Sequence, residues 1–175
     1  MALYGLSRPL AAGSASLMLI GWAVGAPVIG WLSDRVASRK YPVMGAAALA
    51  AGSFSTLILV DSLPLLVAET MLLLNGVACG GMVVLFAATR ENNAAEASGA
   101  AVSLVNAAVM VSGAVLQPVI GWMLDLQWDG SKEAGARIYS VTAYETAFLT
   151  LVFSSLLAAV LCLFIRERRD EPARR

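Results

Sequence analysis

The stretch ASGAAVSLVNAAVMVSGAVLQPVIGWML, residues 97–124, decides the fold class because it contains no charged side chain. The apolar core of a bilayer is about 30 Å thick, and an α-helix needs about 20 consecutive apolar residues to cross it. The run exceeds that length, and Glu96 and Asp125 bound it. It therefore predicts a membrane-spanning helix.

Four further runs have the same character, and Glu69 and Glu145 are the only charged residues inside them. They cover residues 14–33, 41–60, 64–89 and 139–165. Charged residues make up 14% of the chain, against about 25% in an ordinary soluble domain. We therefore predict an all-α integral membrane protein with five transmembrane helices packed as a bundle over residues 14–165, with the lipid bilayer as its solvent.

The distribution of basic residues predicts the orientation. Five spans place the two termini on opposite sides, and the side richer in Lys and Arg lies in the cytoplasm. One side would hold nine basic residues, and the other would hold Arg8, Lys132 and Arg137. We therefore expect a multi-pass protein of the cell (inner) membrane with an external N-terminal loop, residues 1–13, and a cytoplasmic tail, residues 166–175.

The composition excludes several classes of function. A formal net charge of zero gives no basic field for nucleic acid. There is no His, the commonest metal ligand and general base. Cys79 and Cys162 lie inside apolar runs and form neither a disulfide framework nor a zinc site. We therefore expect no enzymatic activity, no metal and no cofactor.

A short internal repeat indicates a transporter architecture. Residues 27–34 read PVIGWLSD and residues 118–125 read PVIGWMLD. By the charge count the first copy runs inward and the second outward, which is the signature of an inverted repeat. The alternative is a chance match in a chain rich in Gly and Val. Two copies of three helices would make six spans, so we expect one helix to be missing before residue 1.

Pairs of glycines predict how the helices pack. Gly21 and Gly25 are four residues apart, as are Gly76 and Gly80. Small residues at this spacing allow helix backbones to approach closely in lipid. The pattern predicts a packed bundle, but it is common in membrane proteins and selects no function.

Residues 30–40, GWLSDRVASRK, resemble the signature loop G-x-L-[SA]-D-R-x-G-x-[RK]-[RK] of the major facilitator superfamily. Ala37 stands where the family prefers Gly, which adopts positive φ more easily. Residues 89–93, Gly99 and residues 117–122 also resemble the helix 10–11 region of the family. The resemblance covers residues 14–125. It implies that the five helices correspond to helices 8–12 of a twelve-helix secondary transporter, as a partial six-helix half.

The resemblance also implies a cytoplasmic gate motif, in which the signature loop holds the two halves of the transporter together. Asp34 would accept hydrogen bonds from a neighbouring helix N-terminus. Arg35 and Arg39 would pair with acids at helix ends. The motif comprises Gly30, Asp34, Arg35, Arg39, Lys40 and Glu91. The alternative is an ordinary topogenic loop with solvated charges.

Three polar residues inside the spans are candidates for a substrate cavity: Asn75, Asn106 and Gln117. If they face a central cavity, they would hydrogen-bond a polar solute. If they face neighbouring helices, they would join them, at about 0.6–2 kcal/mol each. Glu69 and Glu145 lie too near the span ends for a midplane proton carrier. A coupling proton, and hence symport, is therefore an expectation from the family alone.

Two functional hypotheses follow. In the first, the chain is part of a secondary active transporter that moves a small solute by alternating access. It would be inactive without the missing N-terminal half. In the second, it is a small multi-pass protein that self-assembles or assists a partner without transporting.

Overall fold

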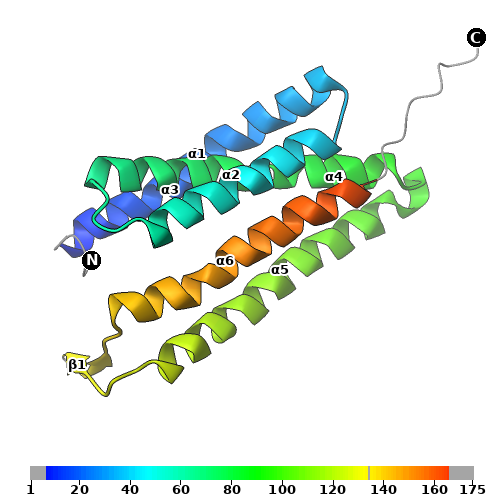
Figure 1. The fold of residues 1–175 in the computed structure, drawn as a ribbon. Helices are drawn as coiled ribbons and strands as arrows, with labels where there is room; N and C mark the ends of the chain where they lie inside the picture. Colours follow the sequence, from blue (N-terminus) through cyan, green and yellow to red (C-terminus); the bar gives the residue numbers. More distant parts are fainter. Residues whose placement is uncertain (1–6, 134, 166–175) are drawn as a thin grey trace, which may run out of the picture.

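The computed structural model describes residues 7–133 and 135–165, which form a bundle of long helices (Figure 1). The helices are α1 (Arg8–Val36), α2 (Lys40–Leu59), α3 (Leu65–Cys79), α4 (Met82–Glu91), α5 (Ala95–Leu126) and α6 (Val141–Leu161), and α6 continues into the 3-10 turn η1 (Cys162–Phe164). Two short strands, β1 (Lys132–Glu133) and β2 (Ala136–Arg137), pair antiparallel between α5 and α6.

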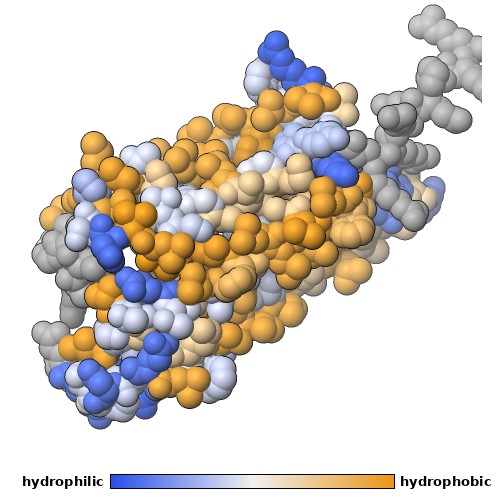
Figure 2. All heavy atoms as spheres, viewed as in Figure 1, coloured by the Kyte–Doolittle hydropathy of each residue, from blue (hydrophilic) through white to orange (hydrophobic). Residues whose placement is uncertain are grey.

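Five helical segments of the described chain are long and apolar enough to cross a membrane, and α3 and α4 together make the third of them. Figure 2 shows apolar surface along the length of the bundle and hydrophilic side chains gathered mainly at its two ends. This distribution suits a protein with hydrocarbon around its middle and water at both ends. The predicted fold class, an all-α membrane protein with five transmembrane helices, is confirmed.

The connections fall at two opposite ends of the bundle (Figure 1). We call one the motif end; it holds the α1–α2 turn, the α4–α5 turn and η1. We call the other the hairpin end; it holds the α2–α3 turn and the β1–β2 loop. α1 and α5, which carry the two PVIGW segments, run in opposite directions (Figure 1), as an inverted repeat requires.

The first helix begins earlier than the predicted span 14–33. Ser7 has the extended backbone of an N-cap, and Pro9 lies in the first turn, where its missing N–H has no partner to lose. Residues 8–13 are therefore helical rather than part of the predicted N-terminal loop. Residues 1–6 and the predicted tail 166–175 lie outside the described residues.

The third predicted span, 64–89, corresponds to one apolar helical segment, Leu65–Glu91, in which a tighter turn at Gly80 and Gly81 separates α3 from α4. The N–H of Gly80 bonds to the carbonyl of Val77, and that of Gly81 to the carbonyl of Ala78, both at 3.0 Å. These bonds reach back three residues instead of four, so the chain turns more tightly than an α-helix. The backbone of Gly80 also lies directly against α1, which leaves no room for a side chain there.

The closest helix contact joins α1 and α3 through the predicted glycine pairs. A Cβ added to Gly25 would lie 2.6 Å from Cα of Val77, and one added to Gly76 would lie 2.9 Å from Cα of Met18. Ordinary van der Waals contact begins at 3.4 Å. Because only hydrogen fits at these positions, the two backbones approach closely, as small residues allow in lipid.

The remaining helices surround this pair unequally. α2 packs against both α3 and α6, and a small core at the motif end joins α1, α2, α4 and η1 through Ile29, Val43, Ala46, Val84 and Cys162. Among the described elements, α5 packs mainly against α4 and α6. None of its residues is buried by the part of the chain that the structure describes. α5 is therefore the least covered helix of the bundle.

Candidate functional site

The α1–α2 turn has a fixed geometry that begins with the C-terminus of α1. Ala37 adopts the left-handed conformation, with φ 50° and ψ 39°. The N–H of Ala37 donates to the carbonyl of Asp34, and the N–H of Ser38 donates to the carbonyl of Ser33, both at 3.2 Å. This is the Schellman pattern that usually has Gly at the left-handed position. Ala37 keeps that conformation at a steric cost of about 1 kcal/mol relative to Gly.

Arg39 connects three helix ends at the motif end. Its Nη1 lies 2.6 Å from Oδ1 of Asp34 at the end of α1. Its Nη2 lies 2.6 Å from Oε1 of Glu91 at the end of α4, and its Nε donates to Oε2 of Glu91 at 3.0 Å. This two-point contact between a guanidinium and a carboxylate is the strongest geometry for such a pair. The hydrogen bonds to Glu91 and then to Asp34 raise the pKa of Arg39.

Ser33 connects Arg39 of this cluster to the backbone of the α1–α2 turn. Its side chain is fully buried, accepts a hydrogen bond from Nη1 of Arg39 at 2.9 Å and donates to the carbonyl of Ser38 at 2.7 Å. A buried hydroxyl without partners would be costly, and both of these bonds satisfy it. The sequence does not predict this role of Ser33, because Ser and Ala are equally acceptable at that position of the family loop.

The other motif residues have different surroundings. Lys40 donates from Nζ to the carbonyl of Leu163 at 2.9 Å, which ties the start of α2 to η1. The guanidinium of Arg35 lies 5.1 Å from the centre of the Trp31 ring. A Cβ on Gly30 would meet nothing within 4 Å. The structure therefore brings Asp34, Arg39 and Glu91 together, but it places Arg35 and Gly30 apart from them.

The hydrogen-bond donor to Asp34 in the structure differs from the donor that the resemblance implied. The resemblance implied hydrogen bonds from the N-terminus of a neighbouring helix, but within the described chain Asp34 accepts from the side chain of Arg39. Arg39 is the residue before α2, so the partner of Asp34 comes from the start of a neighbouring helix but is a side chain and not a backbone N–H.

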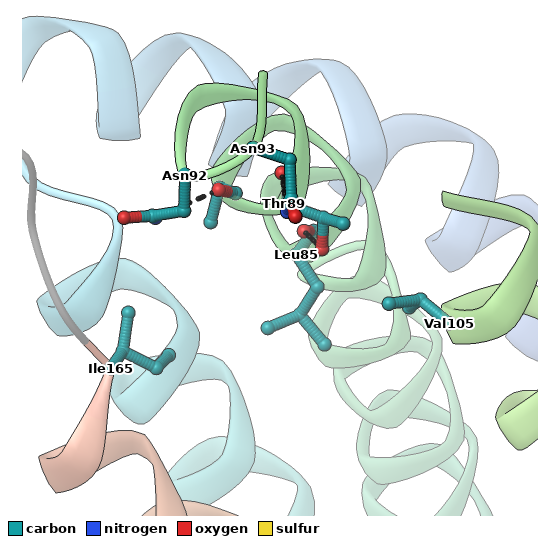
Figure 3. Close-up of a pocket in the computed structure, with 7 residues that line it drawn as sticks. Leu85, Thr89, Asn92, Asn93, Val105 and Ile165 are labelled. Atoms are coloured by element: carbon teal, nitrogen blue, oxygen red, sulfur yellow. Dashed lines mark hydrogen bonds between the residues drawn. The ribbon is translucent and has the colours of Figure 1, made fainter. Parts of the chain in front are cut away.

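A groove of about 650 Å³ opens beside this cluster (Figure 3). It lies between α4, α5 and the residue that follows η1, and it is lined by Leu85, Ala88, Thr89, Asn92, Asn93, Val105 and Ile165. Thr89, Asn92 and Asn93 each donate to the carbonyl four residues earlier, at 2.7–2.9 Å. None of the three predicted cavity residues lines this groove.

Asn75 faces a neighbouring helix. Its side chain is fully buried, and its Nδ2 lies 3.3 Å from Oγ of Ser53 and 3.5 Å from the carbonyl of Ala50, both on α2. These contacts join α3 to α2. The geometry therefore supports the inter-helix alternative for Asn75 rather than contact with a solute.

Asn106 and Gln117 lie on the uncovered helix α5, and both are exposed. They are eleven residues apart, which is about three helical turns, so they share one face. Gly113 lies on the same face, and a Cβ there would meet nothing within 4 Å. Within the described residues, this face of α5 therefore presents two amides to whatever lies beside the bundle.

A second charged cluster, which sequence analysis did not identify, lies at the hairpin end. Nη1 of Arg137 lies 2.6 Å from Oδ1 of Asp125, and the hydroxyl of Tyr139 donates to the same oxygen at 2.5 Å. The guanidinium of Arg137 also lies 4.6 Å from the centre of the Trp128 ring. The hydrogen bonds to Asp125 raise the pKa of both Arg137 and Tyr139. The only signal in the sequence was Asp125 itself, the last residue of the repeat.

The described residues contain no group of three or more His, Cys, Asp or Glu side chains that could hold a metal ion. A comparison with protein families matches the model of the Major Facilitator Superfamily over residues 1–175. Searches of curated proteins and of solved structures found no significant match. With five apolar helices, an inverted repeat and the ion-paired loop 30–40, the chain belongs to the major facilitator superfamily, a family of membrane transporters for small solutes.

Proposed function

We propose that the chain is part of a secondary active transporter that moves a small solute by alternating access, and that it contributes helices 8–12. The observation that carries this proposal is the uncovered face of α5 with Asn106 and Gln117. An amide without a hydrogen-bond partner in an apolar medium costs roughly 2–7 kcal/mol. That face therefore meets a water-filled path or another polar helix surface, while the apolar faces meet lipid.

The path implies a solute with hydrogen-bonding groups, because two amides three turns apart can donate to it and accept from it. The groove at the motif end offers further polar atoms on its rim from Thr89, Asn92 and Asn93. Both features belong to α4 and α5. We therefore place the solute path along these two helices, with the other half of the transporter on its far side.

The cluster of Asp34, Arg39 and Glu91 would act as the cytoplasmic gate motif. It holds the ends of α1 and α4 together through the residue that starts α2. Arg35 lies over Trp31 at the surface, with its charge available to an acid on the other half. In the proposed cycle this contact forms when the cytoplasmic side closes. A coupling proton would be carried outside this chain, because its spans hold no central acid.

The orientation can be tested directly with single cysteines. We expect a membrane-impermeant thiol reagent added to intact cells to label Ser131→Cys at the hairpin end but not Val36→Cys at the motif end. Both parent side chains are exposed. The unsubstituted chain gives the background from Cys79 and Cys162. Labelling of Val36→Cys from outside would refute the cytoplasmic placement of the motif end.

The transport proposal predicts that the chain alone, reconstituted in liposomes, does not catalyse saturable uptake of sugars, amino acids or organic acids. Saturable uptake would show that it is not an incomplete half. The same solutes can be screened for thermal stabilisation of the chain in detergent. A solute that stabilises the parent should stabilise Gln117→Leu less, and Phe153→Leu, a control on exposed α6, equally. Equal stabilisation of the parent and Gln117→Leu would contradict the proposed path.

The second candidate function is self-assembly of a small membrane protein. The observation that favours it is again the exposed face of α5, because a second copy could cover the amides as well as another half would. The oligomeric state in mild detergent separates the two proposals. A stable dimer that is lost in Gln117→Leu supports self-assembly, and a monomer supports the transporter half.

A further inference from the structure

The two aspartates that end the repeated segments occupy equivalent places at opposite ends of the bundle. Asp34 lies in the last turn of α1 at the motif end, and Asp125 lies in the last turn of α5 at the hairpin end. Pro27 and Pro118 lie inside these helices seven residues before them. The resemblance between the two segments therefore extends from sequence to position in the fold.

Each aspartate pairs with an arginine from the loop that follows its helix. Nη1 of Arg39 lies 2.6 Å from Oδ1 of Asp34, and Nη1 of Arg137 lies 2.6 Å from Oδ1 of Asp125. The arginine is five residues away in the first case and twelve in the second. The β1–β2 loop accounts for the longer interval, and it returns the chain to the same acid.

The pair at the hairpin end connects three parts of the chain. Arg137 belongs to β2, and Tyr139 follows it and donates to the same oxygen of Asp125. The Tyr139 ring packs edge-on against Tyr144 of α6, with centroids 6.0 Å apart. The end of α5 is thus linked through the loop to the start of α6, as Arg39 links the ends of α1 and α4 to the start of α2.

The two clusters differ in what else contacts each arginine. Arg39 binds a second acid, Glu91, whereas the guanidinium of Arg137 lies beside an aromatic ring. The Trp128 ring takes that place, with the guanidinium 4.6 Å from its centre, and the indole N–H donates to the carbonyl of Ser131 at 2.9 Å. A cation over an indole ring is stabilised where water has partial access.

We propose that Asp125 and Arg137 form a latch at the hairpin end that is the inverted counterpart of the Asp34–Arg39 pair. It holds the described residues of the loop, 127–133 and 135–140, against the ends of α5 and α6. This role rests on the proposed transport function: the latch restrains the end of the bundle opposite the gate motif, so each end has its own Asp–Arg pair after an equivalent helix.

Hydrogen exchange of the purified chain in nanodiscs tests the latch without any transport measurement. The reporter is the loop 127–140, in which the N–H of Ile138 bonds to the carbonyl of Ser131 at 3.1 Å. We expect Asp125→Ala to speed exchange of this loop about two- to fivefold, the size of effect that exposed ion pairs have. The matched control is Asp34→Ala, which should speed exchange of residues 34–40 and leave the loop unchanged.

Coupling between the two residues completes the test. Arg137→Ala should also speed exchange of the loop, although Asp125→Ala additionally loses the Tyr139 bond and Arg137→Ala the Trp128 contact. Because the two variants remove one shared ion pair, the double variant should exchange more slowly than the product of the two single effects. The charge swap of Asp125→Arg with Arg137→Asp should restore part of the protection. Unchanged exchange in Asp125→Ala, additive effects in the double variant, or faster exchange across all helices would overturn the latch. None of these results depends on whether the chain transports.

Discussion

Replacing Gly25 by Ala should destabilise the bundle, although the same change stabilises most helices. The new methyl would lie 2.6 Å from Cα of Val77, where ordinary contact begins at 3.4 Å. The carbonyl oxygen of Val77 would lie even nearer than its Cα. Both are backbone atoms, so no side chain can rotate away, and α1 and α3 must separate. Overpacking of this kind typically costs about 1–3 kcal/mol.

Gly30→Ala is the matched control because it lies in the same helix, with nothing within 4 Å of the added Cβ. Both changes gain the same helix propensity, up to about 1 kcal/mol. The difference between the two variants therefore isolates the contact between α1 and α3. At about 2–4 °C per kcal/mol for a chain of this size, the melting temperatures should differ by several degrees.

The assay is thermal denaturation in one detergent, followed by the fraction that stays monodisperse on size-exclusion chromatography. Gly25→Ala should melt below both the parent and Gly30→Ala. Gly76→Ala, from the facing helix, should behave like Gly25→Ala, because its Cβ would lie 2.9 Å from Cα of Met18. Equal melting of Gly25→Ala and Gly30→Ala would refute the close α1–α3 contact.

Three further predictions use the same assay. Ala37→Gly should raise stability by about 1 kcal/mol because φ is 50° there, and a lower melting temperature would contradict the left-handed turn. Arg39→Lys should lower stability by up to about 1 kcal/mol, because Lys cannot make the two-point contact with Glu91. The loss should vanish in a Glu91→Gln background; a loss that persists would show that the pair is not responsible. Asn75→Ala should cost about 0.6–2 kcal/mol through the lost bond to Ser53, while Asn106→Ala on exposed α5 should be near neutral. Equal losses at the two asparagines would refute the inter-helix role.

The spans could be predicted from the sequence because charged and turn residues mark where each helix meets water. Asp34, Asp61 and Asp125 each lie at or near the end of a helix. The inverted repeat could be predicted for a similar reason, since PVIGW recurs with the same aspartate after it. Hydropathy and the identity of the two repeated segments are read from the sequence alone, so neither requires knowledge of how the helices pack.

The break between α3 and α4 could not be predicted, because glycine is common inside membrane helices. Gly80 breaks the helix where α1 presses against it, and that contact depends on the rotation of both helices. The same rotation decides the environment of Asn75. Sequence placed it in the third span but left open whether it faced a solute or α2.

The candidate site was predictable only in part. The family resemblance implied that Arg39 pairs with an acid at a helix end, with Glu91 as a candidate, but it did not predict the contact between Arg39 and Asp34. The ion pair of Asp125 and Arg137 could not be predicted, because the two residues are twelve apart in sequence and a hairpin brings them together. The direction of Arg35 toward Trp31 is a choice of side-chain rotamer, which no spacing rule fixes.

The turn at Gly80 and Gly81 separates two segments of one membrane span that are held in different ways. The segment before it is fitted backbone to backbone against α1, whereas the segment after it ends in the carboxylate that Arg39 holds. A rod with a joint bends there at lower cost than an unbroken rod. Loss of the ion pair at the motif end would therefore act first on the segment after the joint and less on the segment packed against α1.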